Sequence, residues 1–137
     1  MKKLIACLLI LSSCASNEPA NDINFTTIFE TSNGTETATY EEVISFYTKL
    51  AETYSEISIQ AIGETDSGKP IHLVTLNPTL EFDFDNIRKN NKRILLINNG
   101  IHPGESDGID ASMLLFRDIV QGKIEKPLNT VLATIPV

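Results

Sequence analysis

The sequence lacks several features that mark common classes of protein. Basic residues are outnumbered, with 11 lysines and arginines against 18 aspartates and glutamates, which gives a formal net charge of −7. This balance gives a nucleic-acid-binding role no electrostatic basis. After the first dozen residues, no apolar run is long enough to cross a bilayer. The full chain has 137 residues, and 42% of them are hydrophobic, which suits one globular domain with a core.

Cysteine is scarce, and both cysteines lie in an N-terminal segment that has the pattern of a secretion signal. The segment MKKLIACLLILSSCAS has two lysines, then a short apolar core, then small residues. Its Leu11–Cys14 stretch, LSSC, resembles the bacterial lipobox, in which the cysteine is lipidated and becomes the new N-terminus. We therefore expect residues 1–13 to be a lipoprotein signal peptide and Cys14 to be the lipidation site. An ordinary cleaved signal with an incidental cysteine is the alternative.

Lipidation of Cys14 would determine where the protein is located. Cys7 would leave with the signal, so no intrachain disulfide could form. Each buried methylene of an acyl chain contributes about 0.8 kcal/mol, so several chains would hold the protein stably on a membrane. We expect a lipoprotein anchored in the bacterial cell envelope and facing the periplasm or the exterior. Residues 14–24 would form a tether, and residues 25–137 the folded domain.

The first half of the domain has signals for a helix and a pair of strands. Apolar residues recur at helical spacing over 40–54, and Thr39 with Glu42 forms a capping box. The predicted buried face consists of Tyr40, Val43, Ile44, Tyr47, Leu50, Ala51 and Tyr54. ISIQAIG and IHLVTLN are β-rich and flank a turn segment, so they predict an antiparallel pair. His72, in the second strand, is interpreted as a structural histidine, and residues 78–92 are predicted to be a solvated loop.

The second half has the pattern of a strand–helix–strand unit. Residues 93–99 predict a buried central strand because they show no polar alternation. A helix over 107–121, ended by Gly122, and a strand over 130–135 follow. Such a unit implies parallel pairing and a right-handed crossover. The expected fold class is α/β, with a mixed, mainly parallel sheet, helices on both faces and an antiparallel pair at one side.

The stretch NNGIHPGESDG joins the predicted 93–99 strand to the helix and has the residues of a metal site. Ligands of an open α/β sheet collect outside the C-terminal ends of its strands, where His102 and Glu105 lie. Gly104 allows a sharp turn between them, and the helix N-terminus favours an ionised Glu105. A neutral imidazole and an ionised carboxylate converging from one turn are suitable zinc ligands. In the alternative interpretation, Glu105 only caps the helix and His102 is a loop residue.

Two motifs together resemble the zinc carboxypeptidases of the carboxypeptidase A type. Residues 63–71, GETDSGKPI, look like the hairpin that precedes the catalytic strand in that family, and residues 99–105 match its first zinc motif, His-x-x-Glu. The resemblance covers about residues 40–137. It implies that His102 and Glu105 are zinc ligands and that zinc activates water to hydrolyse C-terminal peptide bonds. The substrates would be the C-termini of peptides or proteins.

The chain departs from the family's pattern after His102. The family's third ligand is a later histidine, its general base is a still later glutamate, and arginines between them hold the substrate carboxylate. No histidine follows His102, and His72 precedes it, so we expect an N-terminal portion of the catalytic domain, with the general base beyond Val137. Alone, it would bind zinc weakly, be inactive and aggregate through an unprotected strand over 130–135. Gly104 stands where digestive members have a basic residue, which leaves the preferred substrate residue open.

Two other functions fit the same residues. Zinc-dependent amidohydrolases of the desuccinylase and aspartoacylase type share His-x-x-Glu and cleave small N-acyl amino acids, although they generally lack a signal peptide. A non-enzymatic binding lipoprotein of the envelope could keep the turn for structural reasons alone. A later histidine and glutamate, with arginines between them, would favour the carboxypeptidase, and their absence would favour the binding protein.

Overall fold

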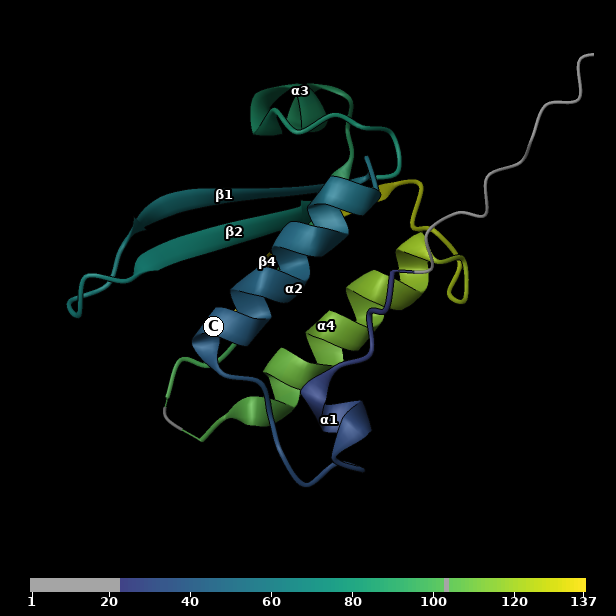
Figure 1. The fold of residues 1–137 in the computed structure, drawn as a ribbon. Helices are drawn as coiled ribbons and strands as arrows, with labels where there is room; N and C mark the ends of the chain where they lie inside the picture. The colour runs from purple at the N-terminus through teal and green to yellow at the C-terminus, as the bar shows by residue number, and fades with distance from the viewer. Residues whose placement is uncertain (1–22, 103) are drawn as a thin grey trace, which may run out of the picture.

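The computed structural model describes residues 23–102 and 104–137, so the predicted signal peptide and Cys14 lie outside the described residues. None of the helices in these two ranges is long and apolar enough to cross a membrane. The elements follow in the order shown in Figure 1: α1 (Ile28–Thr31), α2 (Tyr40–Thr53), β1 (Ile57–Glu64), β2 (Pro70–Leu76), α3 (Phe84–Lys89), β3 (Arg93–Asn98), α4 (Ser106–Val120) and β4 (Thr130–Ile135).

Four strands form one mixed sheet in the order β1-β2-β4-β3. β1 pairs with β2 and β2 with β4 in the antiparallel sense, whereas β3 and β4 are parallel. Because α4 connects β3 to β4, the predicted strand–helix–strand unit and the predicted antiparallel pair are both confirmed. Parallel pairing is limited to β3 and β4, so the described sheet is less parallel than the sequence suggested.

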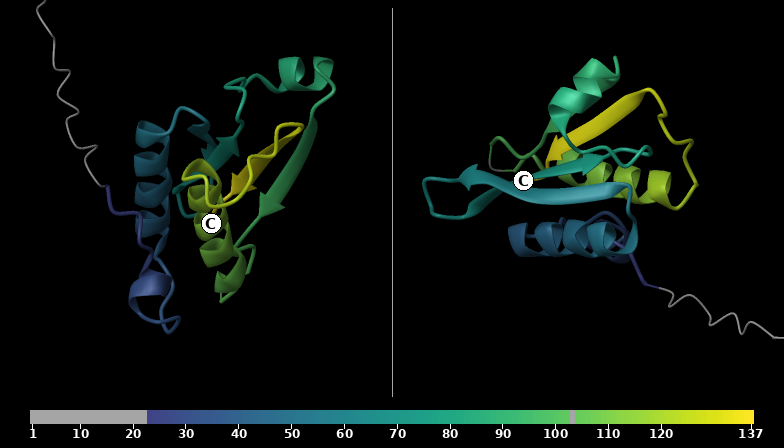
Figure 2. Two further views of the ribbon diagram at one scale, coloured as in Figure 1. Left: turned by 90° about the vertical axis from the view of Figure 1, so that its right-hand side faces the viewer. Right: turned by 90° about the horizontal axis from the view of Figure 1, so that it is seen from above.

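Helices lie on both sides of the sheet, but unequally (Figure 2). α2 and α4 lie side by side on one face, and the short α3 lies behind the other face, near one end. Buried side chains of α2, α4 and the strands form one core, in which Tyr47 and Phe116 meet edge to face with ring centroids 5.7 Å apart. The α/β fold class predicted from the sequence is confirmed.

α2 forms as predicted, but its buried face differs from the predicted one. Thr39 accepts a hydrogen bond from the Glu42 amide, and the Glu42 carboxylate accepts one from the Thr39 amide at 2.8 Å, which completes the capping box. Phe46, which the predicted face omits, is buried because the ring of Phe25 packs against it edge to face at 6.1 Å. Four residues of the predicted face are only half-buried, namely Tyr40, Ile44, Ala51 and Tyr54. Packing by the N-terminal segment therefore rotates the buried face slightly.

The prediction of an uninterrupted loop over 78–92 is wrong, because α3 forms within it. Asp83 caps this helix by accepting hydrogen bonds from two main-chain amides in its first turn, and Ile87 is fully buried. Acidic residues followed by basic ones suggested a solvated loop. That order also suits the dipole of a short helix, with Asp85 in the first turn and Arg88 in the last.

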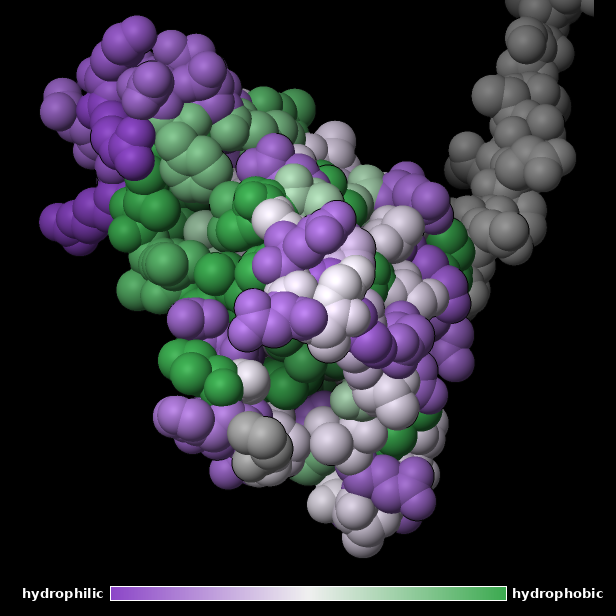
Figure 3. Space-filling model, turned by 90° about the vertical axis from the view of Figure 1, so that its left-hand side faces the viewer, coloured by the Kyte–Doolittle hydropathy of each residue, from purple (hydrophilic) through white to green (hydrophobic). Residues whose placement is uncertain are grey.

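The positions of the two parallel strands differ from those predicted. β3 is an edge strand of the described sheet and not a central one, and its Leu95 and Leu96 are 53% and 56% exposed. β4, which was expected to be unprotected, lies between β2 and β3, and its Val131 and Ala133 are buried. An apolar run fits either position, because burial depends on which elements lie beside the strand. Figure 3 shows apolar surface, in green, exposed between polar regions.

One buried arginine attaches the N-terminal segment to α4. Arg117, 7% exposed, donates from Nη1 to Glu30 Oε2 at 2.6 Å and to the Phe25 carbonyl at 3.2 Å, and from Nε to Asp118 Oδ1 at 2.8 Å. These hydrogen bonds from the guanidinium hold the pKa of both carboxyl groups below their usual range. The sequence did not predict α1, whose N-terminus is closed by a capping box of Thr27 and Glu30.

Candidate metal site

The residues predicted to bind zinc lie in a turn between the end of β3 and the start of α4, where the sequence placed them. Gly104 has a φ of +89°, in the left-handed region that other residues adopt only with strain. The Glu105 amide donates to the His102 carbonyl at 3.3 Å, which closes the turn. Glu105 then occupies the N-cap position of α4. Pro103 lies outside the described residues.

This turn brings the two predicted ligands into contact. His102 Nδ1 lies 2.9 Å from Glu105 Oε1, and the His102 main-chain amide donates to Glu105 Oε2 at 3.3 Å. The two side chains are 75% and 55% exposed, so a solute can reach both. Glu105 makes no side-chain capping hydrogen bond to α4. The Glu105 carboxylate is thus directed to His102 and not to the first amides of α4.

The donor pair fits one side of a zinc coordination sphere. Zinc binds histidine nitrogen and carboxylate oxygen at about 2.0–2.2 Å, so two ligand atoms of a tetrahedral site lie about 3.3 Å apart. The 2.9 Å separation of His102 Nδ1 and Glu105 Oε1 needs only a small widening to admit the ion. Zinc ligands must be deprotonated, so binding of the ion would depend on pH.

Two ligands do not complete such a site. Within residues 23–102 and 104–137, no three His, Cys, Asp or Glu side chains converge as a metal-binding group. His72 is half-buried in β2, and its Nδ1 lies 3.4 Å from the Tyr40 hydroxyl. The same hydroxyl donates to the Pro70 carbonyl at 2.6 Å. His72 thus contributes to the packing of α2 against the β1–β2 hairpin, which agrees with its interpretation as a structural histidine.

A cavity of about 200 Å³ opens beside the His102–Glu105 turn. Its lining residues are Thr37, Gly100, His102, Gly104, Glu105, Ser106, Ile109 and Val137. Ile109 and Val137 make part of the wall apolar. Thr37 comes from the segment before α2, and no local pattern could have identified it, because only the tertiary fold brings that segment to the turn.

A buried polar network lies behind the turn and was also missed. Asn99, 7% exposed, donates from Nδ2 to Ser112 Oγ at 2.9 Å and to Thr134 Oγ1 at 3.2 Å, so it joins the end of β3 to α4 and β4. A Cβ atom at Gly108 would lie only 2.7 Å from Asn99 Oδ1, so glycine is what allows this close approach. The available signal for this network in the sequence was the presence of two polar residues, Ser112 and Thr134, inside otherwise apolar elements.

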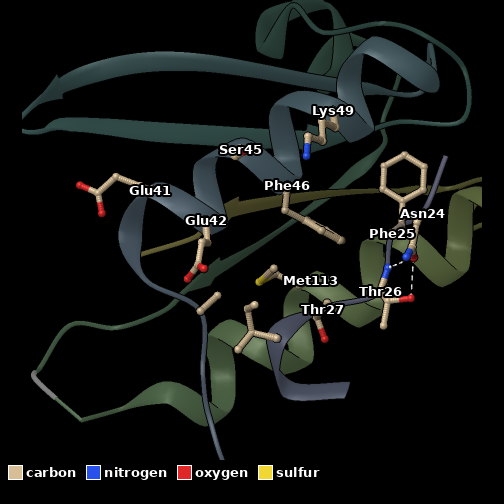
Figure 4. A pocket seen from close by; sticks show the side chains of 12 residues that line it. Asn24, Phe25, Thr26, Thr27, Glu41, Glu42, Ser45, Phe46, Lys49 and Met113 are labelled. Carbon is tan, nitrogen blue, oxygen red and sulfur yellow. Dashed lines mark hydrogen bonds between the residues drawn. The ribbon is translucent and has the colours of Figure 1, made fainter. Parts of the chain in front are cut away.

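A second cleft, of about 320 Å³, lies between α2 and the N-terminal segment (Figure 4) and shares no lining residue with the first. Phe46 and Met113 line it, and at its rim Asn24 Oδ1 accepts from the Thr26 amide at 2.8 Å. Neither histidine nor cysteine is among its lining residues. This cleft therefore lacks the imidazole or thiolate ligands typical of a zinc site, and the His102–Glu105 turn is the better candidate for one.

The described fold is similar to those of solved carboxypeptidases. Carboxypeptidase A from Helicoverpa armigera matches with a TM-score of 0.62 and 20% identity, over 74% of this chain and 24% of that chain. Bovine thrombin-activatable fibrinolysis inhibitor, solved with tick carboxypeptidase inhibitor, matches with a TM-score of 0.58 and 16% identity, over 74% and 31%. A metallo-carboxypeptidase from Burkholderia cenocepacia matches with a TM-score of 0.57 and 21% identity, over 73% and 26%.

These matches show a zinc carboxypeptidase-like fold, which confirms the sequence resemblance at the level of the fold. This chain spans between 24% and 31% of the length of those three structures. No family model matches the sequence, and no curated protein matches it. At these identities the likeness extends to the fold alone, so the activity has to be argued from the site.

Proposed function

We propose that the full-length protein is a zinc-dependent metallocarboxypeptidase that hydrolyses C-terminal peptide bonds of peptides or proteins. One observation carries the proposal: His102 Nδ1 and Glu105 Oε1 meet at 2.9 Å at the C-terminal end of β3, within a carboxypeptidase-like fold. The end of a parallel strand is where ligands of α/β proteins collect. Because one fold supports several chemistries, this donor pair counts for more than the fold itself.

The residues of the turn would have separate tasks. His102 and Glu105 would hold the ion, and zinc, when bound, supplies a Lewis acid that acidifies water and polarises a carbonyl group. Glu105 would bind the ion as a carboxylate from the N-cap position of α4. Asn99 would keep the turn fixed to α4 and β4. The apolar side of the cavity, at Ile109, offers a surface on which an apolar part of a substrate can pack.

The proposed reaction also requires groups that the described residues do not supply. A catalytic zinc site of this class has three protein ligands and one open position. Among the described residues, two such side chains meet and no third one joins them. A general base is also required, and general acid–base catalysis contributes about 10²–10⁴-fold to rate. We therefore expect residues 14–137, expressed alone, to bind zinc weakly and to show no carboxypeptidase turnover.

We further propose that the protein is a lipoprotein of the bacterial cell envelope. The LSSC stretch at the end of an apolar N-terminal segment supports this location. Mass spectrometry of the N-terminal peptide from the native host tests it. A lipid-modified Cys14 at the N-terminus is the expected result, and an unmodified N-terminus at another residue would contradict the proposal.

A substrate panel tests the activity of the full-length protein. Peptides with a free C-terminus should lose their last residue, the same peptides with an amidated C-terminus should not, and a chelator should abolish turnover. Hydrolysis of N-acyl amino acids but not of peptides would instead indicate an amidohydrolase of the desuccinylase type. Stoichiometric zinc without hydrolysis of either substrate class would indicate a binding protein.

A further inference from the structure

A second site is suggested by an aspartate that no described residue neutralises. Asp110 lies in the second turn of α4 and is 5% exposed. Its Oδ1 is buried and accepts no hydrogen bond from any part of the chain that the structure describes. A buried carboxylate without partners is strongly unfavourable, and buried charges in proteins are normally paired or bound to metal ions. A cation beside Asp110 would supply the partner that Oδ1 lacks.

Asp110 lines a cavity of about 170 Å³ between α4 and the segment that connects α1 to α2. The residues that line it are Phe29, Gly34, Thr35, Glu36, Thr37, Ser106, Asp107 and Asp110. Three of them are acidic and three carry hydroxyl groups, whereas no lysine, arginine or histidine is among them. Asp107 and Asp110 are three residues apart on α4, a spacing that places side chains on the same helix face. The cavity is therefore negatively charged and lined by oxygen donors.

The donor chemistry selects the kind of cation. Carboxylate, hydroxyl and carbonyl oxygens suit hard ions, whereas zinc and copper prefer sites with histidine or cysteine. Calcium accepts six to eight oxygens in irregular geometry, and magnesium demands a near-ideal octahedron. Within residues 23–102 and 104–137 no three acidic side chains converge on one point. The ion would thus use Asp110, one further carboxylate, neutral oxygens and water, an arrangement that calcium tolerates better than magnesium.

We propose that this cavity is a calcium site, in which Asp110 supplies the buried negative charge and Asp107 or Glu36 supplies the second carboxylate. With only two carboxylates, the affinity falls in the range of the weaker calcium modules, with a Kd of about 10⁻⁴–10⁻³ M. The ion links the segment before α2 to the first two turns of α4. Thr37 and Ser106 line both this cavity and the one beside His102, so calcium also stabilises a wall of the candidate zinc site.

Calorimetric titration of the full-length protein with calcium, in metal-free buffer, tests the proposal. Salt at physiological strength suppresses non-specific attraction of the ion to the net negative charge of the protein. We expect one calcium ion per chain, about tenfold weaker binding of magnesium, and a rise in Tm of about 5 °C in calcium at ten to twenty times the Kd. Asp110→Asn should weaken calcium binding at least tenfold. The matched control Asp66→Asn, in the exposed β1–β2 turn, should bind calcium normally.

Two further measurements distinguish a calcium site at Asp110 from calcium bound at the His102–Glu105 turn or spread over the acidic surface. In a chelator, Asp110→Asn should have a higher Tm than the wild type, because it removes a buried charge that lacks a partner, and calcium should reverse that order. His102→Ala should bind calcium normally, so the calcium site and the zinc proposal can fail independently.

Unchanged calcium binding by Asp110→Asn, equal binding of magnesium, or no binding at millimolar calcium would each overturn the proposal. If Asp110→Asn does not fold, unchanged binding by Glu36→Gln/Asp107→Asn would overturn it.

Discussion

Near its C-terminal end, α4 carries Arg117, a buried cation whose guanidinium is bonded to Glu30, Asp118 and the Phe25 carbonyl. Near its N-terminal end, the same helix carries Asp110, a buried aspartate whose Oδ1 accepts no hydrogen bond from a described residue, and the exposed Glu105 is its N-cap. A charge that the protein satisfies internally stabilises the fold. A charge that it leaves unsatisfied is the kind of group that binds a ligand.

This difference divides α4 into an anchoring half and a binding half. The anchoring half fixes the N-terminal segment through contacts that span 87 and 92 residues of sequence. The binding half follows directly from β3, whose end provides the turn that carries His102. Substitutions of the charged residues in the anchoring half should therefore alter stability, and substitutions of the charged residues in the binding half should alter binding of metal ions.

Among substitutions of charged residues, the largest expected effect on stability is that of Arg117→Met. The methionine fills much of the same space but leaves Glu30 and Asp118 without their buried partner. Breaking a buried ion pair by removing one member costs about 3–5 kcal/mol, and we expect about 3 because Glu30 is partly exposed. Urea unfolding at neutral pH measures the change. The control Arg88→Met removes an exposed pair with Asp85 and should change the free energy of unfolding by less than about 0.5 kcal/mol.

Glu30→Gln should give a smaller loss that depends on pH. The hydrogen bond from Arg117 holds the pKa of Glu30 below its ordinary value of 4.5. A lowered folded-state pKa stabilises the protein fully above the unfolded-state value and loses this contribution as pH falls through the folded-state value. We expect the variant to be about 1 kcal/mol less stable at pH 7, after allowance for solvent screening, and the gap to close below about pH 4.5.

Urea unfolding of both proteins at pH 7 and at pH 3 tests this prediction. The exposed Glu52→Gln, on the outer side of α2, serves as a matched control and should show no such dependence. A gap between wild type and Glu30→Gln that is as large at pH 3 as at pH 7 would show that the charge of Glu30 is not what stabilises the N-terminal segment.

Gly108→Ala, in the binding half, should destabilise the protein by about 1 kcal/mol even though alanine is the better helix former. The new methyl group would lie 2.7 Å from Asn99 Oδ1 and push this side chain away from Ser112 and Thr134. In an Asn99→Ala background the same substitution should become neutral or stabilising, because nothing remains to collide with. An additive double-mutant cycle would contradict the close approach as the cause.

The smallest expected change in stability is that of Leu96→Lys on the exposed edge strand β3. This side chain is 56% exposed, so the free energy of unfolding should change by less than about 0.5 kcal/mol. A charge on an edge strand opposes strand-to-strand association, so light scattering by residues 14–137 should fall markedly. Val131→Lys, on the interior strand β4, should unfold the chain instead. Equal scattering by the wild type and Leu96→Lys would exclude β3 as the aggregating strand.

The elements that local signals specify were predictable from the sequence. α2 begins at the capping box of Thr39 and Glu42, and α4 ends one residue before the predicted end, ahead of Gly122 with its φ of +73°. Strand order was not predictable, because the apolar sequence RILLIN of β3 is compatible with an edge strand as well as with a central strand. α3 was missed because its charge order also fits a solvated loop, although Asp83 was a usable capping signal.

The candidate zinc ligands could be proposed from sequence because both come from one short turn, in which Gly104 and the helix start determine the geometry locally. Thr37, Asn99 and Asp110 could not be assigned, because their roles arise from segments distant in the chain. Asp110, in particular, has the sequence context of an ordinary helix residue. Only its burial against the segment before α2 distinguishes it.

The zinc content of purified full-length protein tests the central claim most directly. Elemental analysis should find one zinc ion per chain in the wild type and a stoichiometry near zero in His102→Ala, with circular dichroism unchanged because His102 is an exposed turn residue. The matched control His72→Ala should retain its zinc, because His72 packs against Tyr40 on the β1–β2 hairpin. Full zinc occupancy in His102→Ala, or its loss in His72→Ala, would contradict the assignment of the His102–Glu105 turn as the metal site.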